Sequence, residues 1–275
     1  MNAPALTLLA VHAHPDDEVT GSGGVLARAA AEGIATVVVT CTDGRCGDGP
    51  GGVKPGEPGH DPDAVVATRR AELAASCAVL KVSHTETLGY GDSGMMGWPA
   101  NSAPGAFWTT PVAEAAERLA GIIRRYRPDV IVTYDENGGY GHPDHIQTHR
   151  VTMAALALLE EPPAKVYWST VSESWTRDMM AHMRDMGVED VEEEVAEAPP
   201  AGLPDDQITT WVDTTAFNDQ KYDALAAHAS QSDSEFFLGL GRERFARLMG
   251  TECFVRVRDT TGAPLPETDL FAGLR

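Results

Sequence analysis

The chain has few cysteines and few basic residues, and it contains no long apolar run. Its four cysteines are too sparse for a disulfide framework and do not form the Cys-x-x-Cys spacing of a structural zinc or thioredoxin-like site: Cys41, Cys46, Cys77 and Cys253. No segment approaches the roughly 20 apolar residues of a membrane span, and the start of the sequence lacks the basic and apolar regions of a secretory signal. We therefore expect a reduced, cytoplasmic protein.

Positive charge is also scarce. The 21 Lys and Arg residues are outnumbered by 41 Asp and Glu residues, which gives a formal net charge of -20. Proteins that bind phosphate backbones or anionic membranes concentrate basic residues on one face. The composition thus argues against nucleic acid and membrane as partners. A homo-oligomer is left open, because no feature of the sequence marks one.

Apolar runs alternate with segments of helical periodicity along the first two thirds of the chain. Strands are predicted near 5–12, 35–42, 84–88, 129–135 and 164–170, and helices at 17–32, 63–81, 111–126 and 143–160. Parallel strands need crossover connections of this kind, and buried parallel strands are apolar throughout. We predict an α/β fold with a Rossmann-like, mostly parallel sheet flanked by helices.

The last third of the chain is predicted to form a smaller α/β part. An acidic surface linker over 189–200 is followed by a strand at 210–212, helices at 215–230 and 235–248, and a strand at 252–257. We expect one domain over 1–275, in which a core of 1–170 carries a C-terminal extension, 171–275, that completes the pocket.

Two Gly/Pro-rich segments, 43–62 and 92–108, follow predicted strands and should overhang the same rim of the sheet. The first is long enough to be either a mobile lid or a binding loop.

Two short clusters of histidine and aspartate carry the chemistry: His14-Pro15-Asp16-Asp17 and His142-Pro143-Asp144-His145. Each follows a predicted strand and opens a helix, which is where open α/β sheets bind ligands. One such cluster alone is explained as well by a capped helix start as by a metal-binding motif. Two of them at equivalent junctions point to a metal site, because a catalytic zinc takes three protein ligands and leaves a fourth position for water.

Two histidines and one carboxylate from these clusters complete such a shell, and further groups remain for catalysis. Asp16 is the candidate general base, since it is next to Asp17 in the chain but points to another side of the helix. The spacing does not decide which histidine of the second cluster is a ligand. If His142 is left over, it could act as a charged donor to the oxyanion or the leaving amine, oriented by a hydrogen bond that it donates to the Asp144 carboxylate.

The clusters resemble the zinc-dependent PIG-L/LmbE-like de-N-acetylases, through the segments Ala13 to Glu18 and Gly141 to His145. Further matching pieces resemble the mycothiol branch of that superfamily, which comprises N-acetylglucosaminyl-inositol deacetylase and mycothiol S-conjugate amidase: Tyr134 to Tyr140, Asp92 to Met95, Lys221, and His228 to Gln231. The resemblance covers most of the chain.

The resemblance implies a role for each of these residues. It implies His14, Asp17 and His145 as ligands of one Zn²⁺ per chain. It also implies Asp16 as the base, His142 as the electrophilic or acid histidine, and Tyr140 as an aid to the oxyanion. Substrate contacts are implied for four residues: Arg69, Asp92, Lys221 and Gln231. Fe²⁺ or another divalent ion would suit the same ligands.

The implied activity is removal of an N-acetyl group from an N-acetylglucosamine-type sugar, either an N-acetylglucosaminyl-inositol or a natural-product glycoside. The segments 43–62 and 98–108 depart from the mycothiol enzymes, which leaves the aglycone and the acyl group open. Conjugate amidase chemistry is the alternative. A non-catalytic sugar- or nucleotide-binding Rossmann domain would need a Gly-rich phosphate loop where His14 to Asp17 stand.

Several residues near the clusters also have structural interpretations. Arg69 could be a solvated helix residue paired with Glu72, and Asp92 a turn residue. His12 is expected to pack or hydrogen-bond beneath the site, and His149 to have a structural role. Glu18 is expected to accept hydrogen bonds that brace the metal loop.

Overall fold

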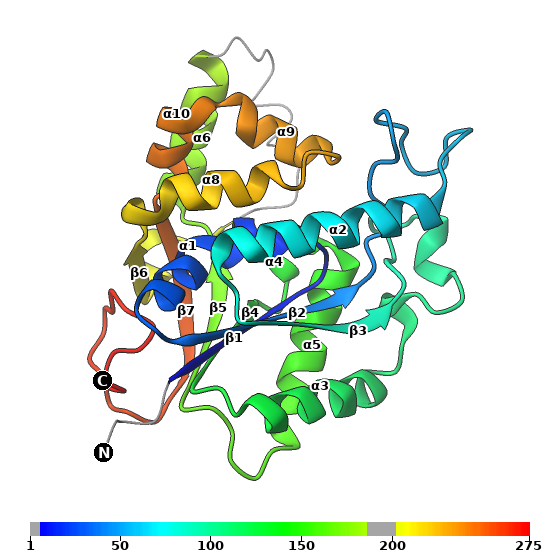
Figure 1. The fold of residues 1–275 in the computed structure, drawn as a ribbon. Helices are drawn as coiled ribbons and strands as arrows, with labels where there is room; N and C mark the ends of the chain where they lie inside the picture. Colours follow the sequence, from blue (N-terminus) through cyan, green and yellow to red (C-terminus); the bar gives the residue numbers. More distant parts are fainter. Residues whose placement is uncertain (1–5, 186–201) are drawn as a thin grey trace.

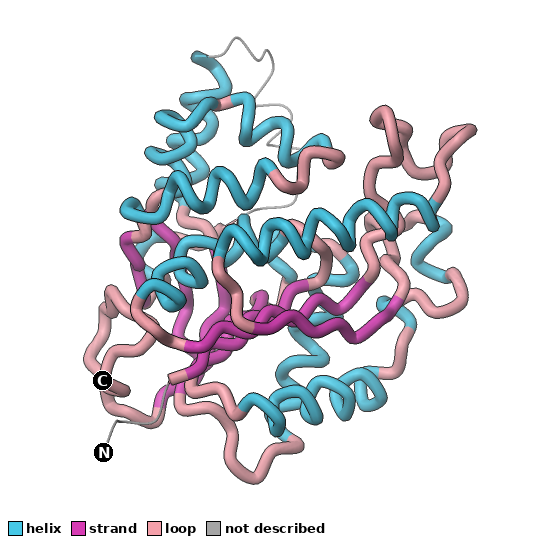
Figure 2. The backbone as a smooth tube through the Cα atoms, viewed as in Figure 1, coloured by secondary structure: helices cyan, strands magenta, loops and turns pink. Residues whose placement is uncertain are grey.

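The computed structural model describes residues 6–185 and 202–275, so the linker predicted at 189–200 lies outside the described residues. A seven-stranded sheet runs through the molecule, with helices on both faces (Figures 1 and 2). The strands are β1 (Thr7–His12), β2 (Ala35–Thr42), β3 (His84–Tyr90), β4 (Val130–Tyr134), β5 (Lys165–Thr170), β6 (Thr210–Asp213) and β7 (Thr251–Asp259).

The helices divide between the two faces of the sheet. They are α1 (Asp17–Ala31), α2 (Pro62–Leu80), α3 (Val112–Tyr126), α4 (Gly138–Gly141), α5 (Pro143–Ala157), α6 (Glu173–Asp185), α8 (Asn218–Ala226), α9 (Ser232–Gly239) and α10 (Gly241–Met249), with short 3-10 turns at η1 (Pro99–Ser102), η2 (Phe107–Thr109), η3 (Asp205–Gln207) and η4 (Thr215–Phe217). In Figure 1, α1, α2 and α8 cover one face and α3 and α5 the other, while α6, α9 and α10 lie beyond α8. None of the described helices is long and apolar enough to span a membrane.

The strand order β3-β2-β1-β4-β5-β7-β6 confirms the predicted α/β class. The first five strands are parallel, while β7 runs antiparallel to both β5 and β6. From β1 the chain builds outward first to β2 and β3, and then on the other side to β4 and β5. The order therefore reverses between β1 and β4, and ligands bind at such a switch point. The two histidine clusters follow these two strands.

Strand β1 shows why the sheet is buried on both faces. Leu8 and Ala10 belong to the core cluster on the side of α1 and α8, and Leu9 and Val11 belong to the cluster on the side of α3 and α5. All four side chains are fully buried. Alternate residues of a strand point to opposite faces, so a strand covered on both sides must be apolar at every position.

The C-terminal part differs most from the prediction. The helix expected at 235–248 is two helices, α9 and α10, because Gly241 takes a φ of 71° that interrupts the helical path. The helix expected at 215–230 begins as a 3-10 turn and ends at Ala226, which leaves His228 and Gln231 in a loop. Helix α6 was not predicted.

Candidate metal centre

The first histidine cluster forms a tight turn between β1 and α1. Asp16 has a φ of 107°, which residues other than glycine rarely adopt. Hydrogen bonds on both sides hold this backbone: His14 N–H donates to Asp17 Oδ2 at 2.7 Å, and Asp16 N–H donates to Glu18 Oε2 at 2.9 Å. Strained backbone of this kind persists where the surroundings fix it, and it is concentrated at functional sites.

The second cluster starts α5. His142 is the N-cap residue, and its Nδ1 accepts a hydrogen bond from the backbone N–H of Asp144 at 3.1 Å. His145 follows in the first turn, with Nδ1 3.2 Å from the carbonyl oxygen of Gly138. Gly138 has a φ of 65°, and a Cβ there would lie 2.6 Å from the Cβ of His145. Only glycine lets the segment after β4 approach His145 this closely.

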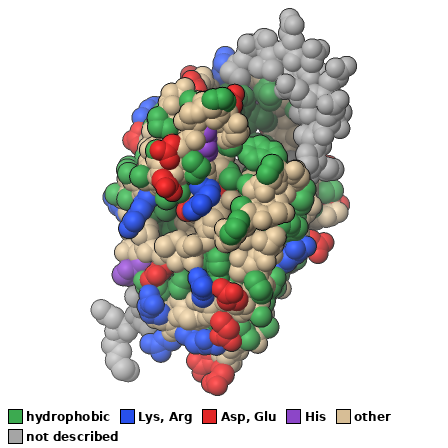
Figure 3. All heavy atoms as spheres, turned by 90° about the vertical axis from the view of Figure 1, so that its right-hand side faces the viewer, with side chains coloured by type: hydrophobic (Ala, Val, Ile, Leu, Met, Phe, Trp, Pro, Cys, Tyr) green, Lys and Arg blue, Asp and Glu red, His purple; other side chains and the backbone are tan. Residues whose placement is uncertain are grey.

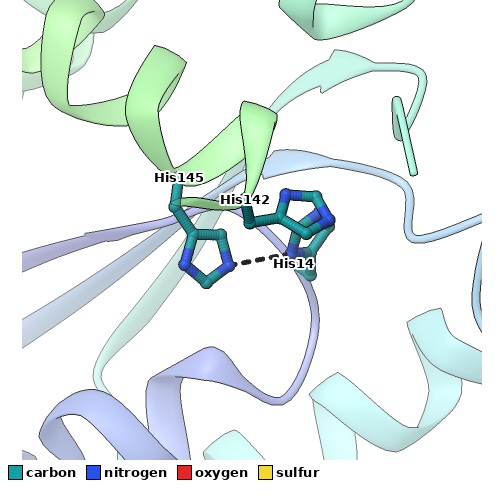
Figure 4. A group of neighbouring side chains, drawn as sticks. All are labelled: His14, His142 and His145. Carbon is teal, nitrogen blue, oxygen red and sulfur yellow. Dashed lines mark hydrogen bonds between the residues drawn. The ribbon is translucent and has the colours of Figure 1, made fainter. Parts of the chain in front are cut away.

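Three side-chain atoms from the two clusters converge at the switch point. His14 Nδ1 lies 3.3 Å from His145 Nε2 and 3.3 Å from Asp17 Oδ2, and His145 Nε2 lies 3.5 Å from Asp17 Oδ2. Figure 4 shows His14 and His145 meeting from separate elements. Ligands about 2.1 Å from a tetrahedral zinc are about 3.4 Å apart. The triangle therefore has the dimensions of one face of a zinc site.

The remaining nitrogens of these two rings face acceptors. His14 Nε2 lies 3.3 Å from Asp144 Oδ2 and 3.5 Å from Asp92 Oδ1, while His145 Nδ1 faces the Gly138 carbonyl. With its proton on this outer nitrogen, each ring turns a lone pair inward, which is the tautomer that a metal-binding histidine needs.

The predicted role of Asp144 is wrong. Its backbone N–H, not its carboxylate, contacts His142, because His142 caps the helix. The carboxylate reaches across to His14 and accepts a further hydrogen bond from Ser93 N–H at 2.8 Å. Asp144 therefore orients a histidine of the triangle and does not orient His142.

We expect Asp144→Asn to weaken metal binding by about 10- to 100-fold, the usual effect of losing a carboxylate behind a metal-binding histidine. The neutral amide oxygen of asparagine is a weaker acceptor for the proton of His14 Nε2 than the carboxylate is. Competition with a chromogenic chelator measures the affinity, and Glu117→Gln on the exposed face of α3 is the matched control. Equal affinities of the two variants would contradict this assignment of Asp144.

His142 also has a ring nitrogen within 4.8 Å of those of His14 and His145. Its Nδ1 lone pair already accepts the Asp144 N–H, so the proton of the neutral ring is on Nε2. Burial lowers the pKa of His142 to about 2. The neutral ring is a donor through Nε2, which favours a neutral donor over the charged donor of the prediction.

Asp16 lies beside the triangle and is paired with Arg69. Arg69 donates to Asp16 Oδ2 at 2.6 Å, to the carbonyl of Pro15, and to the carbonyl of Gly44 at 3.2 Å. Burial raises the pKa of Asp16 to about 6, although the Arg69 charge opposes the shift. The solvated Arg69–Glu72 pair is excluded, because Arg69 is 5% exposed and Glu72 accepts hydrogen bonds from Ser230.

A cavity of about 450 Å³ opens above these groups. Both predicted rim loops line it: residues 46–48 belong to the first, and Asp92, Met95 and Trp98 to the second. Gln231 lines it too, and its Oε1 accepts a hydrogen bond from Asp48 N–H at 3.0 Å. The loop 43–62 is thereby tied across the cavity, which favours the binding-loop interpretation. Tyr140 stands at the edge, 42% exposed, with its ring 5.1 Å from that of His145.

Asp92 is buried in the wall of this cavity. Its carboxylate accepts hydrogen bonds from Cys46 N–H at 3.2 Å and Gly94 N–H at 2.8 Å, in addition to its contact with His14. Asp92 therefore joins the two rim loops to the triangle of His14, Asp17 and His145. An ordinary turn residue would not make these contacts.

Lys221 lies elsewhere. It is 1% exposed, its Nζ is 2.6 Å from Glu252 Oε1, and it does not line the cavity that holds Asp16 and Arg69. Glu252 also accepts hydrogen bonds from the backbone of Gly24 and Val25. The pair joins α8, β7 and α1, so the structure gives Lys221 a packing role and we do not propose it as a substrate contact.

The supporting residues behind the site are mostly as expected. Glu18 braces the turn, with Oε1 accepting from Ser76 Oγ at 2.5 Å and from His228 Nε2 at 2.8 Å. His12 bonds Ser22 beneath the site, and His149 bonds the carbonyl of Tyr134. The role of Ser76 was missed, because a serine within an ordinary helical pattern gives no signal of its partner.

The chain resembles known proteins in both sequence and fold. A family described as GlcNAc-PI de-N-acetylase (PIG-L) matches residues 9–156. The 1D-myo-inositol 2-acetamido-2-deoxy-alpha-D-glucopyranoside deacetylase of Acidothermus cellulolyticus is 42% identical over 283 residues, which cover 98% of this chain and 95% of that protein.

Solved structures share the fold at low identity. N,N'-diacetylchitobiose deacetylase from Pyrococcus horikoshii has a TM-score of 0.58 and 21% identity, covering 92% of this chain and 84% of its own. The 4-carboxy-2-hydroxymuconate hydratase of Pseudomonas putida has a TM-score of 0.60 and 20% identity, covering 94% and 99%. The fold thus hosts different reactions and does not by itself identify one. The sequence matches are specific, and they show that the chain belongs to the PIG-L family of GlcNAc-PI de-N-acetylases.

Proposed function

We propose that the protein is a metal-dependent amide hydrolase that removes the N-acetyl group from an N-acetylglucosamine-type glycoside. The observation that carries the proposal is the triangle of His14, Asp17 and His145, with a separate carboxylate, Asp16, beside it in the same cavity. The name of the 42% identical relative makes an N-acetylglucosaminyl-inositol the first substrate to test. A natural-product glycoside is the other substrate class.

We propose His14, Asp17 and His145 as the metal ligands. The alternative set of three histidines is disfavoured, because His142 has no inward lone pair. Zinc is the first candidate, and Fe²⁺ is the next, since a His/His/Asp set suits several divalent ions. A divalent ion bound there would polarise the amide carbonyl and lower the pKa of a water molecule.

The surrounding residues then have separate tasks. Asp16, held in place by Arg69, takes a proton from the attacking water and later returns it to the departing amine nitrogen. His142 Nε2–H donates a hydrogen bond to the carbonyl oxygen while negative charge develops on it. Tyr140 can add a second donor from the rim. A C–O bond forms, the C–N bond breaks, and acetate and a primary amine leave.

The polar wall of the cavity suits the sugar and its polyol aglycone. Arg69, Asp92 and Gln231 all line it, which supports the three as substrate contacts. Figure 3 looks onto the side of the rim loops and shows basic and acidic side chains interspersed, with no extended basic patch on that face. A small neutral sugar fits such a surface better than a polyanion does.

The test is an assay of primary amine release by the metal-loaded protein. We expect turnover of N-acetylglucosaminyl-inositol, a loss of more than about 100-fold after removal of the metal with dipicolinate, and recovery on adding Zn²⁺. Activity that survives complete metal removal would contradict the proposal. Faster cleavage of a bimane conjugate of mycothiol in the same assay would establish the conjugate amidase alternative instead.

A further inference from the structure

A second cavity lies on the other side of the metal triangle. It has a volume of about 310 Å³ and is lined by Asp17 and His145 at one end. Its wall among the described residues is mainly apolar and includes Val171, Trp175, Phe237 and Met249. Lys221 and Glu252 are also in the wall, but they bond to each other. The cavity therefore offers shape and apolar contact, with little demand for a charged ligand.

The two cavities meet at the reaction centre. Asp17, Thr20, Tyr140 and Phe237 line both of them. Asp16, Arg69 and Asp92 line only the first, and Trp175 and Met249 line only the second. A molecule whose reacting atom sits at the triangle can thus extend a polar part to one side and an apolar part to the other.

An amide substrate has this shape. The nitrogen and the acyl chain leave the carbonyl carbon in different directions, so a sugar placed in the polar cavity directs the acyl chain away from it. Arg69, Asp92 and Gln231 identify the polar side. The methyl group of an acetamide has about the size of one water molecule, roughly 30 Å³, and would leave most of the second cavity unfilled.

We propose that the second cavity is an acyl-chain site, and that the enzyme hydrolyses N-acyl amino sugars with unbranched apolar chains of about four to six carbons. The inference rests on the proposed function, because it uses the same reaction centre. The reaction is balanced as before: water adds to the carbonyl carbon, the C–N bond breaks, and a fatty acid leaves with the amine. Burial of each added methylene should favour the transition state by about fourfold in kcat/KM.

A chain-length series tests the proposal on the metal-loaded protein. Glucosaminyl-inositols carrying N-acetyl, N-butyryl, N-hexanoyl and N-succinyl groups are compared by kcat/KM. We expect at least a tenfold rise from acetyl to hexanoyl, and a value for the charged succinyl group below that of butyryl. If the acetyl compound is hydrolysed and the hexanoyl compound is hydrolysed no faster, the acyl-chain site is overturned and the proposed function stands. No hydrolysis of any compound overturns the proposed function.

Two variants locate the chain in the cavity. Ser169→Phe, at a position of β5 that lines the cavity, should lower the ratio of hexanoyl to acetyl kcat/KM at least tenfold, while Trp175→Ala should move the optimum to a longer chain. A folded Ser169→Phe protein with an unchanged ratio overturns the proposal. Calorimetric titration gives a second readout: hexanoate should bind the metal-loaded wild type at least tenfold more tightly than acetate, and equal affinities overturn the inference.

Discussion

Replacement of His145 by alanine is expected to give a folded protein that no longer retains a divalent ion. His145 Nε2 provides one corner of the triangle, at 3.3 Å from His14 Nδ1 and 3.5 Å from Asp17 Oδ2. Only two ligands remain in this variant. Loss of a residue that hydrogen-bonds to a ligand lowers metal affinity by up to roughly 100-fold, so loss of a ligand itself should lower it further. Elemental analysis after gel filtration should find far less than one ion per chain, and amide hydrolysis should fall with it.

Two other histidines of the same region are the controls. His149→Ala changes the same helix one turn later, where Nδ1 bonds the carbonyl of Tyr134 outside the triangle. This variant should retain the metal. His142→Ala should also retain it but lose turnover, because His142 acts as a donor and not as a ligand. Loss of metal from His142→Ala with retention in Asp17→Asn would favour the three-histidine set and contradict the assignment.

The fold and the position of the site were predictable from local sequence, whereas the choice of His145 over His142 as a ligand came only from the family resemblance. Each parallel strand is an apolar run, and the clusters follow β1 and β4 directly, so the switch point could be located without knowing any side-chain contact. The strained φ of Asp16 was not predictable in this way. It depends on a hydrogen bond to Glu18 and on Arg69, which lies 53 residues away in the chain.

The sequence did not reveal the partners that are remote in the chain. Asp144 was assigned to His142 because the two are neighbours in the chain, yet its carboxylate contacts His14 from 130 residues away. Lys221 was predicted to contact the substrate, and nothing in the sequence indicated that its ammonium is paired with Glu252 inside the fold. A motif shows which polar groups are present, and only the packing of distant elements shows which of them are already paired.

Replacement of Asp16 by asparagine should leave the metal in place and lower kcat by about 10²- to 10⁴-fold, the usual range for loss of a general base. Asparagine is one of the few residues that tolerate a positive φ, so the turn should survive. Stoichiometric metal with a near-normal kcat would contradict the role of Asp16. The change also removes the partner of buried Arg69, so a slow variant alone does not separate a lost base from a displaced arginine.

Chemical rescue makes that separation. Glycine accepts the φ of 107° without strain, so Asp16→Gly should keep the turn and leave a hole beside the Arg69 guanidinium. Formate has the carboxylate that the hole lacks, and it should restore part of kcat in a saturable way. Formamide has a similar size but cannot take a proton, and it should restore nothing. Equal rescue by both would mean that Asp16 only fills space. Because formate also restores an anion beside Arg69, rescue is then compared across small carboxylates of different pKa. A rescued kcat that rises with the pKa of the added carboxylate requires a base at this position, and a kcat that does not depend on it would mean that Asp16 only holds Arg69.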